Sequence, residues 1–169
     1  MLIWYAALAA VGVWAVFDSP ALDYRVVMVG AVLPVPELLL GRPGPLHSLT
    51  AAVAVLAAVM LATRGRRLVR RRWLGIPIGL FAHLVLSGVW ADTDAFWWPL
   101  TGVALSDAEP PELGRGALTL VLEVVGVAAA LWWYRRVGLG DPTARRDFLR
   151  TGQLPRATTT GRPPLTGSC

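Results

Sequence analysis

Lysine is absent from this chain of 169 residues, and cysteine occurs only once, as Cys169. A lone cysteine can form neither an internal disulfide nor a cysteine-based zinc site. Charged residues make up only 16% of the chain, whereas soluble domains usually carry about 25%. With 55% hydrophobic residues and a mean hydropathy of +0.54, this composition is typical of a polytopic membrane protein.

Several familiar motifs are also missing. The chain has no HExxH, no GxSxG and no phosphate-binding P-loop, so it carries none of the common local signatures of a metalloprotease, a serine hydrolase or a nucleotide-binding protein. The basic residues are all arginine and flank apolar stretches. The high sequence pI therefore indicates orientation in a bilayer rather than binding of nucleic acid.

Five apolar stretches are candidates to cross a membrane: Leu2–Phe17, Val26–Leu40, His47–Thr63, Leu74–Ala91 and Gly116–Tyr134. The sequence thus predicts an all-α fold, a polytopic helical membrane protein with four to five transmembrane segments over residues 1–137. The first stretch has no preceding positive charge, so we interpret it as an uncleaved span rather than a signal peptide.

The second stretch contains Pro34, Pro36 and Glu37. Two prolines this close interrupt a helix, so the segment is either a broken span or a re-entrant piece buried in protein. A crossing gives five spans with the N-terminus outside, and re-entry gives four spans with the N-terminus inside. We favour the crossing, broken helix.

Arginine placement predicts the orientation. Six arginines lie in the loop Arg64–Arg72, and more follow the last span. The positive-inside rule places this loop and the C-terminus in the cytoplasm, and the acidic loop Asp92–Arg115 outside. We therefore expect a multi-pass protein of the cell inner (plasma) membrane.

The segment after the last span begins with an expected helix. Asp141 is a good N-cap, and Pro142 suits the first helical position. Residues 138–152 are predicted to form a short cytoplasmic amphipathic helix ending near Arg150. Residues 153–169 are rich in Pro, Thr, Gly and Arg with few hydrophobic residues, so we expect a disordered cytoplasmic tail.

His83 lies within an otherwise apolar span, where an ionisable group is costly unless it has a partner or a task. It stands eight residues before Ala91, and Glu123 stands seven residues after Gly116. At helical rise both lie roughly 10–12 Å below the outer interface. The sequence predicts that His83 and Glu123 are partners and the catalytic pair of any site.

Further polar residues are expected near the same outer-leaflet position: His47, Glu37, Ser87, Asp92 and Asp94. Imidazole and carboxylate ligands suit a divalent metal, most simply zinc, so His47, His83 and Glu37 are the predicted metal ligands. The same groups could also act as general acid and base without metal. The simpler alternatives are that His83 makes an interhelical hydrogen bond and that His47 is a hydrated cap.

Four short motifs share their order with a known family: Gly30-Ala-Val-Leu-Pro34, His47-Ser-Leu, Gly79-Leu-Phe-Ala-His83 and Phe96-Trp-Trp-Pro99. Over about residues 23–102 the chain resembles the LexA-binding, inner-membrane-associated metal-dependent hydrolases, and more closely their small actinobacterial membrane-protein branch. The resemblance implies a metal-dependent hydrolase with His47 and His83 at its site.

The chain departs from the family pattern at two acidic positions, which Val35 and Ser87 occupy. Our first functional hypothesis is a hydrolase acting on a lipid or a lipid-linked envelope substrate. The alternative is a non-catalytic accessory or scaffold subunit of a membrane complex, and a third is a small oligomeric transporter. The expected partners are membrane lipids and either another membrane protein or a second copy of the chain.

Overall fold

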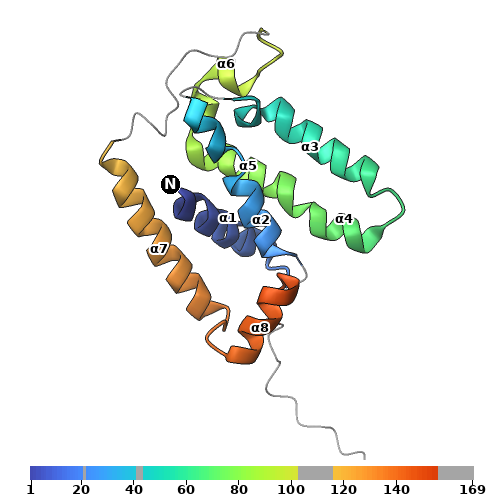
Figure 1. Cartoon of the computed structure of the whole chain (residues 1–169), viewed down its shortest axis with the longest axis vertical. Helices are drawn as coiled ribbons and strands as arrows, with labels where there is room; N and C mark the ends of the chain where they lie inside the picture. The colour runs from blue at the N-terminus through green and yellow to red at the C-terminus, as the bar shows by residue number, and fades with distance from the viewer. Residues whose placement is uncertain (21, 41–43, 103–115, 156–169) are drawn as a thin grey trace, which may run out of the picture.

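The computed structural model describes residues 1–20, 22–40, 44–102 and 116–155, and every regular element in these ranges is helical (Figure 1). The expected all-α class is therefore confirmed. The predicted acidic loop beyond residue 102 and the predicted disordered tail beyond residue 155 lie outside the described residues. The helices are α1 (Leu2–Phe17), α2 (Tyr24–Val32), α3 (Leu49–Ala62), α4 (Arg67–Trp73), α5 (Gly75–Ser87), α6 (Thr93–Phe96), α7 (Leu118–Arg136) and α8 (Pro142–Thr151), with the 3₁₀ turns η1 (Val35–Leu40), η2 (Pro45–His47) and η3 (Val89–Ala91).

The predicted spans differ in how far they are continuous helices. Among the described residues, α7 alone is both long enough and apolar enough to cross a membrane, and α1 and α3 are shorter apolar helices. The second stretch is divided into α2 and η1 around Pro34, as its prolines predict. The fourth stretch ends early because Gly88 adopts a left-handed conformation with φ 79°. Length and composition therefore identify one candidate span in the part of the chain that the structure describes.

The arginine-rich segment is not the simple loop that we expected. Residues Arg67–Trp73 form α4, in which no residue is buried. Arginine is a good helix former, and an exposed helix keeps every guanidinium in contact with the surroundings. The charge pattern of this segment did not indicate its secondary structure, and its cytoplasmic position stays a prediction.

Helices α2 and α5 pack closely, through glycines on both partners. A Cβ on Gly79 would collide with the carbonyl oxygen of Val27, and one on Gly30 would collide with the carbonyl oxygen of Ile76. The two backbones are therefore in direct contact. Because Val26 lies beside Gly75 at one end, the two helices run in the same direction.

Helix α1 packs against α7 and also runs parallel to it. Its first turn meets the middle of α7, where a Cβ on Gly126 would collide with Trp4, and farther along Trp14 packs edge-on against Trp132 at a centroid distance of 6.0 Å. The ring of Tyr24, at the start of α2, lies beside the ring of Trp133, with centroids 5.6 Å apart. Helix α2 therefore begins where α7 ends, and the α1–α7 pair runs opposite to the α2–α5 pair.

Asp23 joins three elements at the start of α2. Its side chain is 3% exposed and caps α2 by accepting from the amides of Arg25 and Val26. It also pairs with the guanidinium groups of Arg25 and of Arg72 in α4, each at 3.2 Å. Arg25 in turn donates to the Leu149 carbonyl at the end of α8, 2.5 Å away. The Asp23 carboxylate thus connects α2 with α4 directly and with α8 through Arg25.

Helix α8 begins as its sequence predicts, with Asp141 as the N-cap and Pro142 in its first turn. The Asp141 carboxylate accepts from the Thr143 hydroxyl and from the Ala144 amide. These hydrogen bonds hold the pKa of the Asp141 carboxyl below its usual range. No residue of α8 is fully buried, so this helix lies on the surface of the bundle.

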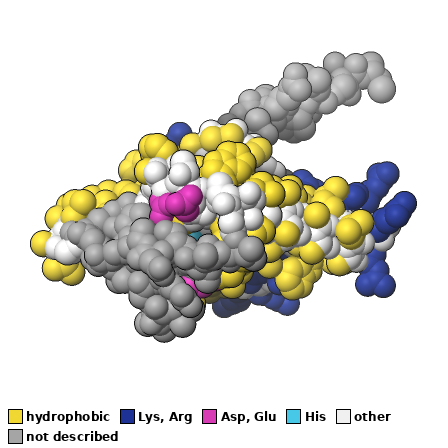
Figure 2. Space-filling model, turned by 90° about the horizontal axis from the view of Figure 1, so that it is seen from above, with side chains coloured by type: hydrophobic (Ala, Val, Ile, Leu, Met, Phe, Trp, Pro, Cys, Tyr) yellow, Lys and Arg dark blue, Asp and Glu magenta, His cyan; other side chains and the backbone are white. Residues whose placement is uncertain are grey.

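Large apolar faces remain uncovered on the outer helices. In α7 only Gly126 and Trp133 are buried, and Leu120 is 71% exposed. Helix α3 buries Ala52 alone. Figure 2 shows apolar side chains over much of the surface, with basic side chains gathered at the end where Figure 1 places α4. Continuous apolar surface of this kind marks contact with a membrane or with another protein.

The close contact between α2 and α5 leads to a test with a matched glycine. We expect Gly79→Ala to lower the free energy of unfolding by about 2 kcal/mol or more, because the methyl group forces the two backbones apart. Gly12→Ala is the control, since a Cβ there meets nothing within 4 Å, and alanine favours the helix by roughly 0.5–1 kcal/mol. Denaturant unfolding in detergent measures both, and equal stability would contradict the close contact.

Candidate functional site

His83 lies on α5, one turn after Gly79, and is completely buried. Its Nδ1 donates to the carbonyl oxygen of Ala31 on α2 at 2.8 Å. The ring also stacks on Tyr5 of α1, with centroids 4.2 Å apart and a tilt of 39°. Because a carbonyl oxygen only accepts, the proton is on Nδ1, and Nε2 is the basic nitrogen of this ring.

His47 is the second buried histidine of the described chain, and the structure brings it to His83. It ends η2 directly before Ser48, whose hydroxyl caps α3 by accepting from the Ala51 amide. The His47 ring meets the His83 ring edge-on, with centroids 5.2 Å apart and an interplanar angle of 78°. Segments 36 residues apart in the sequence therefore meet in one buried imidazole pair.

Glu37 orients the His47 ring through a hydrogen bond. Its carboxylate accepts from His47 Nδ1 at 3.0 Å and from the Leu46 amide. Gly44 makes room for it, since a Cβ at that position would collide with the carboxylate. His47 Nε2 is buried and has no hydrogen-bond partner among the described residues. The structure thus brings Glu37 to His47, and the role of Glu37 as a metal ligand stays a prediction.

Glu123 contacts the start of α1 instead of its predicted partner His83. One Glu123 carboxylate oxygen accepts from the amides of Ile3 and Trp4, at 3.1 and 3.2 Å, and the other pairs with the Met1 ammonium. The first amides of a helix lack intrahelical acceptors, and a carboxylate is favoured there by the helix dipole. The sequence predicted this pair from the equal depth of the two residues along their helices. Depth does not show which neighbouring helix a given face contacts, so the predicted pairing of Glu123 with His83 was wrong.

Ser87 and Val35, the two residues that depart from the family pattern, each have a structural role. Ser87 is buried at the end of α5, where its hydroxyl donates to the Leu84 carbonyl and accepts from the Val89 amide, both at 3.3 Å. Val35 packs against the main hydrophobic core. Ser87 thus helps to end the helix that carries His83, and Val35 contributes apolar contact.

Asp92 and Asp94 lie at the start of α6. Asp92 caps this helix by accepting from the amides of Asp94 and Ala95, and Asp94 is exposed. Within the described ranges there is no group of three or more histidine, cysteine or acidic residues arranged to hold a metal ion. The structure brings His47 into contact with both Glu37 and His83, and the metal-ligand role of these three residues stays a prediction.

The sequence did not predict two of the groups that contact His83. The Ala31 carbonyl that orients His83 is a backbone group, which leaves no trace in residue identity. The Tyr5 ring over His83 belongs to a helix that reads as uniformly apolar. Gly79, one turn before His83, did indicate a close helix approach, and Gly30 on α2 is its partner in that contact.

Comparison with known proteins finds no family model that matches the chain, and no curated protein or solved structure that is similar to it. The resemblance to metal-dependent hydrolases therefore stays a prediction based on the four short motifs.

The role of Glu123 can be tested directly. Glu123→Ala should lower the free energy of unfolding by about 1–3 kcal/mol, because two amides at the start of α1 lose their acceptor. Glu123→Gln keeps an acceptor oxygen and should lose less. In NMR spectra of histidine-labelled protein, the His83 ring resonances should keep their positions in Glu123→Gln. A large shift would restore a direct contact between Glu123 and His83.

Proposed function

We propose that the protein is a multi-pass membrane protein with five crossings, its N-terminus outside and its C-terminus in the cytoplasm. The uncovered apolar faces of α3 and α7 support a lipid environment. The helix directions support the odd number of crossings, because α1 and α7 run one way and α2 and α5 run the other. The re-entrant alternative, with four crossings, gives α1 and α7 opposite directions.

The charges support the orientation. In this arrangement the ends of α1 and α7, the start of α2 and all of α4 and α8 lie on one side. These elements carry most of the arginines of the described chain, and Arg72 contacts Asp23 there. The positive-inside rule assigns that side to the cytoplasm of the plasma membrane. His47 and His83 then lie toward the outer leaflet.

We further propose that His47 and His83 bind a divalent metal, most simply zinc. The observation that carries this proposal is that each imidazole donates Nδ1–H to an oxygen acceptor, Glu37 for His47 and the Ala31 carbonyl for His83. Histidine ligands of metals are almost always held in this way, with the other nitrogen left to bind the ion. The buried His47 Nε2, which has no partner in the described ranges, fits a ligand role.

The proposed activity is hydrolysis of a lipid or a lipid-linked envelope molecule. When bound, a metal of this kind supplies Lewis-acid chemistry that supports hydrolysis. Glu37 would fix the His47 tautomer by holding the proton at Nδ1, and the Ala31 carbonyl would do the same for His83. The membrane position toward the outer leaflet makes a laterally entering lipid the natural substrate class.

Metal analysis tests this proposal. Full-length protein purified in mild detergent without chelator should contain about one divalent ion per chain, and His47→Ala/His83→Ala should contain none. Glu37→Gln should weaken binding by roughly 10–100-fold, as loss of a ligand-orienting carboxylate usually does. Glu123→Gln is the matched control, because Glu123 contacts the start of α1 instead, and it should keep its metal. Metal-free wild type, or equal content in the double variant, would end the metal proposal.

A non-catalytic scaffold subunit is the second candidate. The observation that favours it is burial: both imidazoles are completely inaccessible, and their hydrogen bonds join α5 to α2 and η2 to η1. Such a polar cluster fixes helix positions without any reaction.

A scaffold subunit should be recovered with its partner. Purification from native membranes in mild detergent should return a stoichiometric membrane protein bound to the chain, through the uncovered faces of α3 or α7. A monomer free of partners, with a divalent metal bound, would favour the hydrolase instead.

A further inference from the structure

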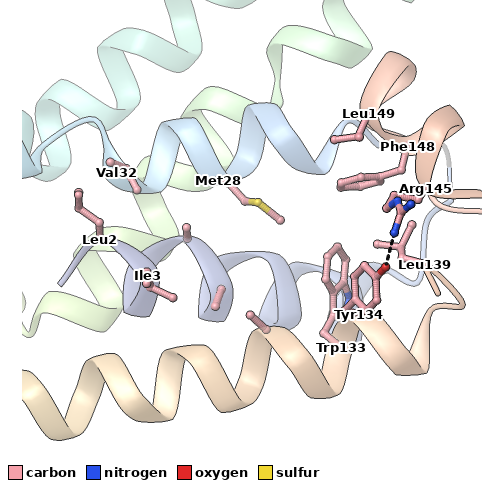
Figure 3. A pocket seen from close by; sticks show the side chains of 13 residues that line it. Leu2, Ile3, Met28, Val32, Trp133, Tyr134, Leu139, Arg145, Phe148 and Leu149 are labelled. Atoms are coloured by element: carbon pink, nitrogen blue, oxygen red, sulfur yellow. Dashed lines mark hydrogen bonds between the residues drawn. The ribbon is translucent and has the colours of Figure 1, made fainter. Parts of the chain in front are cut away.

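An apolar groove runs along α1 and α2 as far as α8. It has a volume of about 500 Å³ and is lined by residues from α1, α2, α7 and α8 (Figure 3). Leu2 at one end is 52% exposed and Leu149 at the other is 64% exposed, so the groove is open to its surroundings. Its volume falls within the range of roughly 300–1,000 Å³ that is usual for small-molecule sites.

The groove is long and almost entirely apolar. It runs from Leu2 and Ile3 in the first turn of α1, past Val32 and Met28 of α2, to Phe148 of α8. Small side chains of α1 and α7 form its floor between these points, among them Ala6 and Ala130. This shape suits a single flexible hydrocarbon chain.

The described polar side chains of the groove lie at its α8 end. Among the described residues that line the groove, Arg145 of α8 is the one that carries a charge, and it donates to the Tyr134 hydroxyl at 3.5 Å. That contact occupies one of the five N–H donors of the guanidinium. Trp133 also lines this end; it is 4% exposed, and its indole N–H has no acceptor among the described residues. A ligand with negative charge at this end would meet the remaining N–H donors of Arg145.

We propose that this groove binds one acyl chain of an anionic phospholipid, with the phosphate held by Arg145. Arginine binds phosphate through paired N–H donors, and basic pockets between membrane helices on the cytoplasmic side are known to hold anionic headgroups. Exposed Arg146 and Arg150 on the same helix add to the local positive charge. The inference rests on the membrane placement in the proposed function but not on the metal site.

Native mass spectrometry of the full-length protein tests the proposal. Protein in mild detergent is incubated with equal amounts of phosphatidylglycerol and phosphatidylcholine of the same acyl chains. Wild type should retain one phosphatidylglycerol per chain, with a preference of about tenfold, as expected for one charge-assisted phosphate contact. Arg145→Gln should lose this preference, whereas Arg146→Gln should keep it, because Arg146 does not line the groove.

A second pair of variants tests the acyl-chain part. Ala6→Phe fills the groove and should abolish retention of both lipids, whereas Ala57→Phe on the exposed face of α3 should not. Equal retention of the two lipids by wild type, or unchanged retention in Arg145→Gln, would overturn the proposal. A dimer that Ala6→Phe dissociates would also overturn it, by assigning the groove to a second copy of the chain.

The outcomes separate this inference from the proposed function. Protein that fractionates with membranes and holds a metal, yet shows no lipid preference, contradicts the lipid site alone. Protein that holds phosphatidylglycerol but no metal contradicts the metal site alone. Recovery of the protein in the soluble fraction would contradict the membrane placement on which both depend.

Discussion

The backbone contact between α2 and α5 is the constraint on which the rest of the structure depends. Gly30 and Gly79 bring the two helices to a distance that no other residue pair allows, since a Cβ on either would collide with backbone atoms of the other helix. At that distance the Ala31 carbonyl reaches His83 Nδ1. The orientation of His83, and through it the imidazole pair with His47, thus follows from the absence of two side chains.

The acidic side chains within the apolar bundle all have hydrogen-bond or ion-pair partners. A buried polar or charged group is costly unless it is hydrogen-bonded or paired. Glu123 meets the amides at the start of α1, Glu37 meets His47 and the Leu46 amide, and Asp23 meets two arginines. These contacts join helices that apolar packing alone would leave free to slide, because small and aliphatic side chains fit one another in many registers.

The sequence predicted the elements better than their partners. Apolar runs, the prolines after α2 and the Asp141 cap located the helices, because these signals act within a few residues. His83 was singled out as a costly polar residue in an apolar span and His47 as a residue at the outer end of another, and the structure brings them together. The partner of Glu123 was missed, since depth along a helix is readable from sequence, whereas the face that a helix turns to its neighbour depends on packing.

The arginine segment shows the same division between local and long-range information. Its charge marked one side of the molecule, but its helical state and its contact with Asp23 depend on where α2 and α4 lie in space. Backbone acceptors such as the Ala31 carbonyl are invisible to any reading of residue types. Chemistry that depends on such acceptors is therefore the part of the site that a single sequence predicts least.

The charged groups of the two proposed sites lie at opposite ends of the helix pair α1–α2. The imidazoles lie toward the start of α1 and the end of α2, where His47 contacts both Glu37 and His83. Arg145 lies at the other end, on α8, and the groove between is lined by apolar side chains. An acyl chain in the groove would pass along both helices as far as Leu2 and Val32, and Val32 follows directly after Ala31, whose carbonyl orients His83. The lipid would therefore stabilise the contact of α8 with the bundle while its phosphate stays far along the helix pair from the imidazoles.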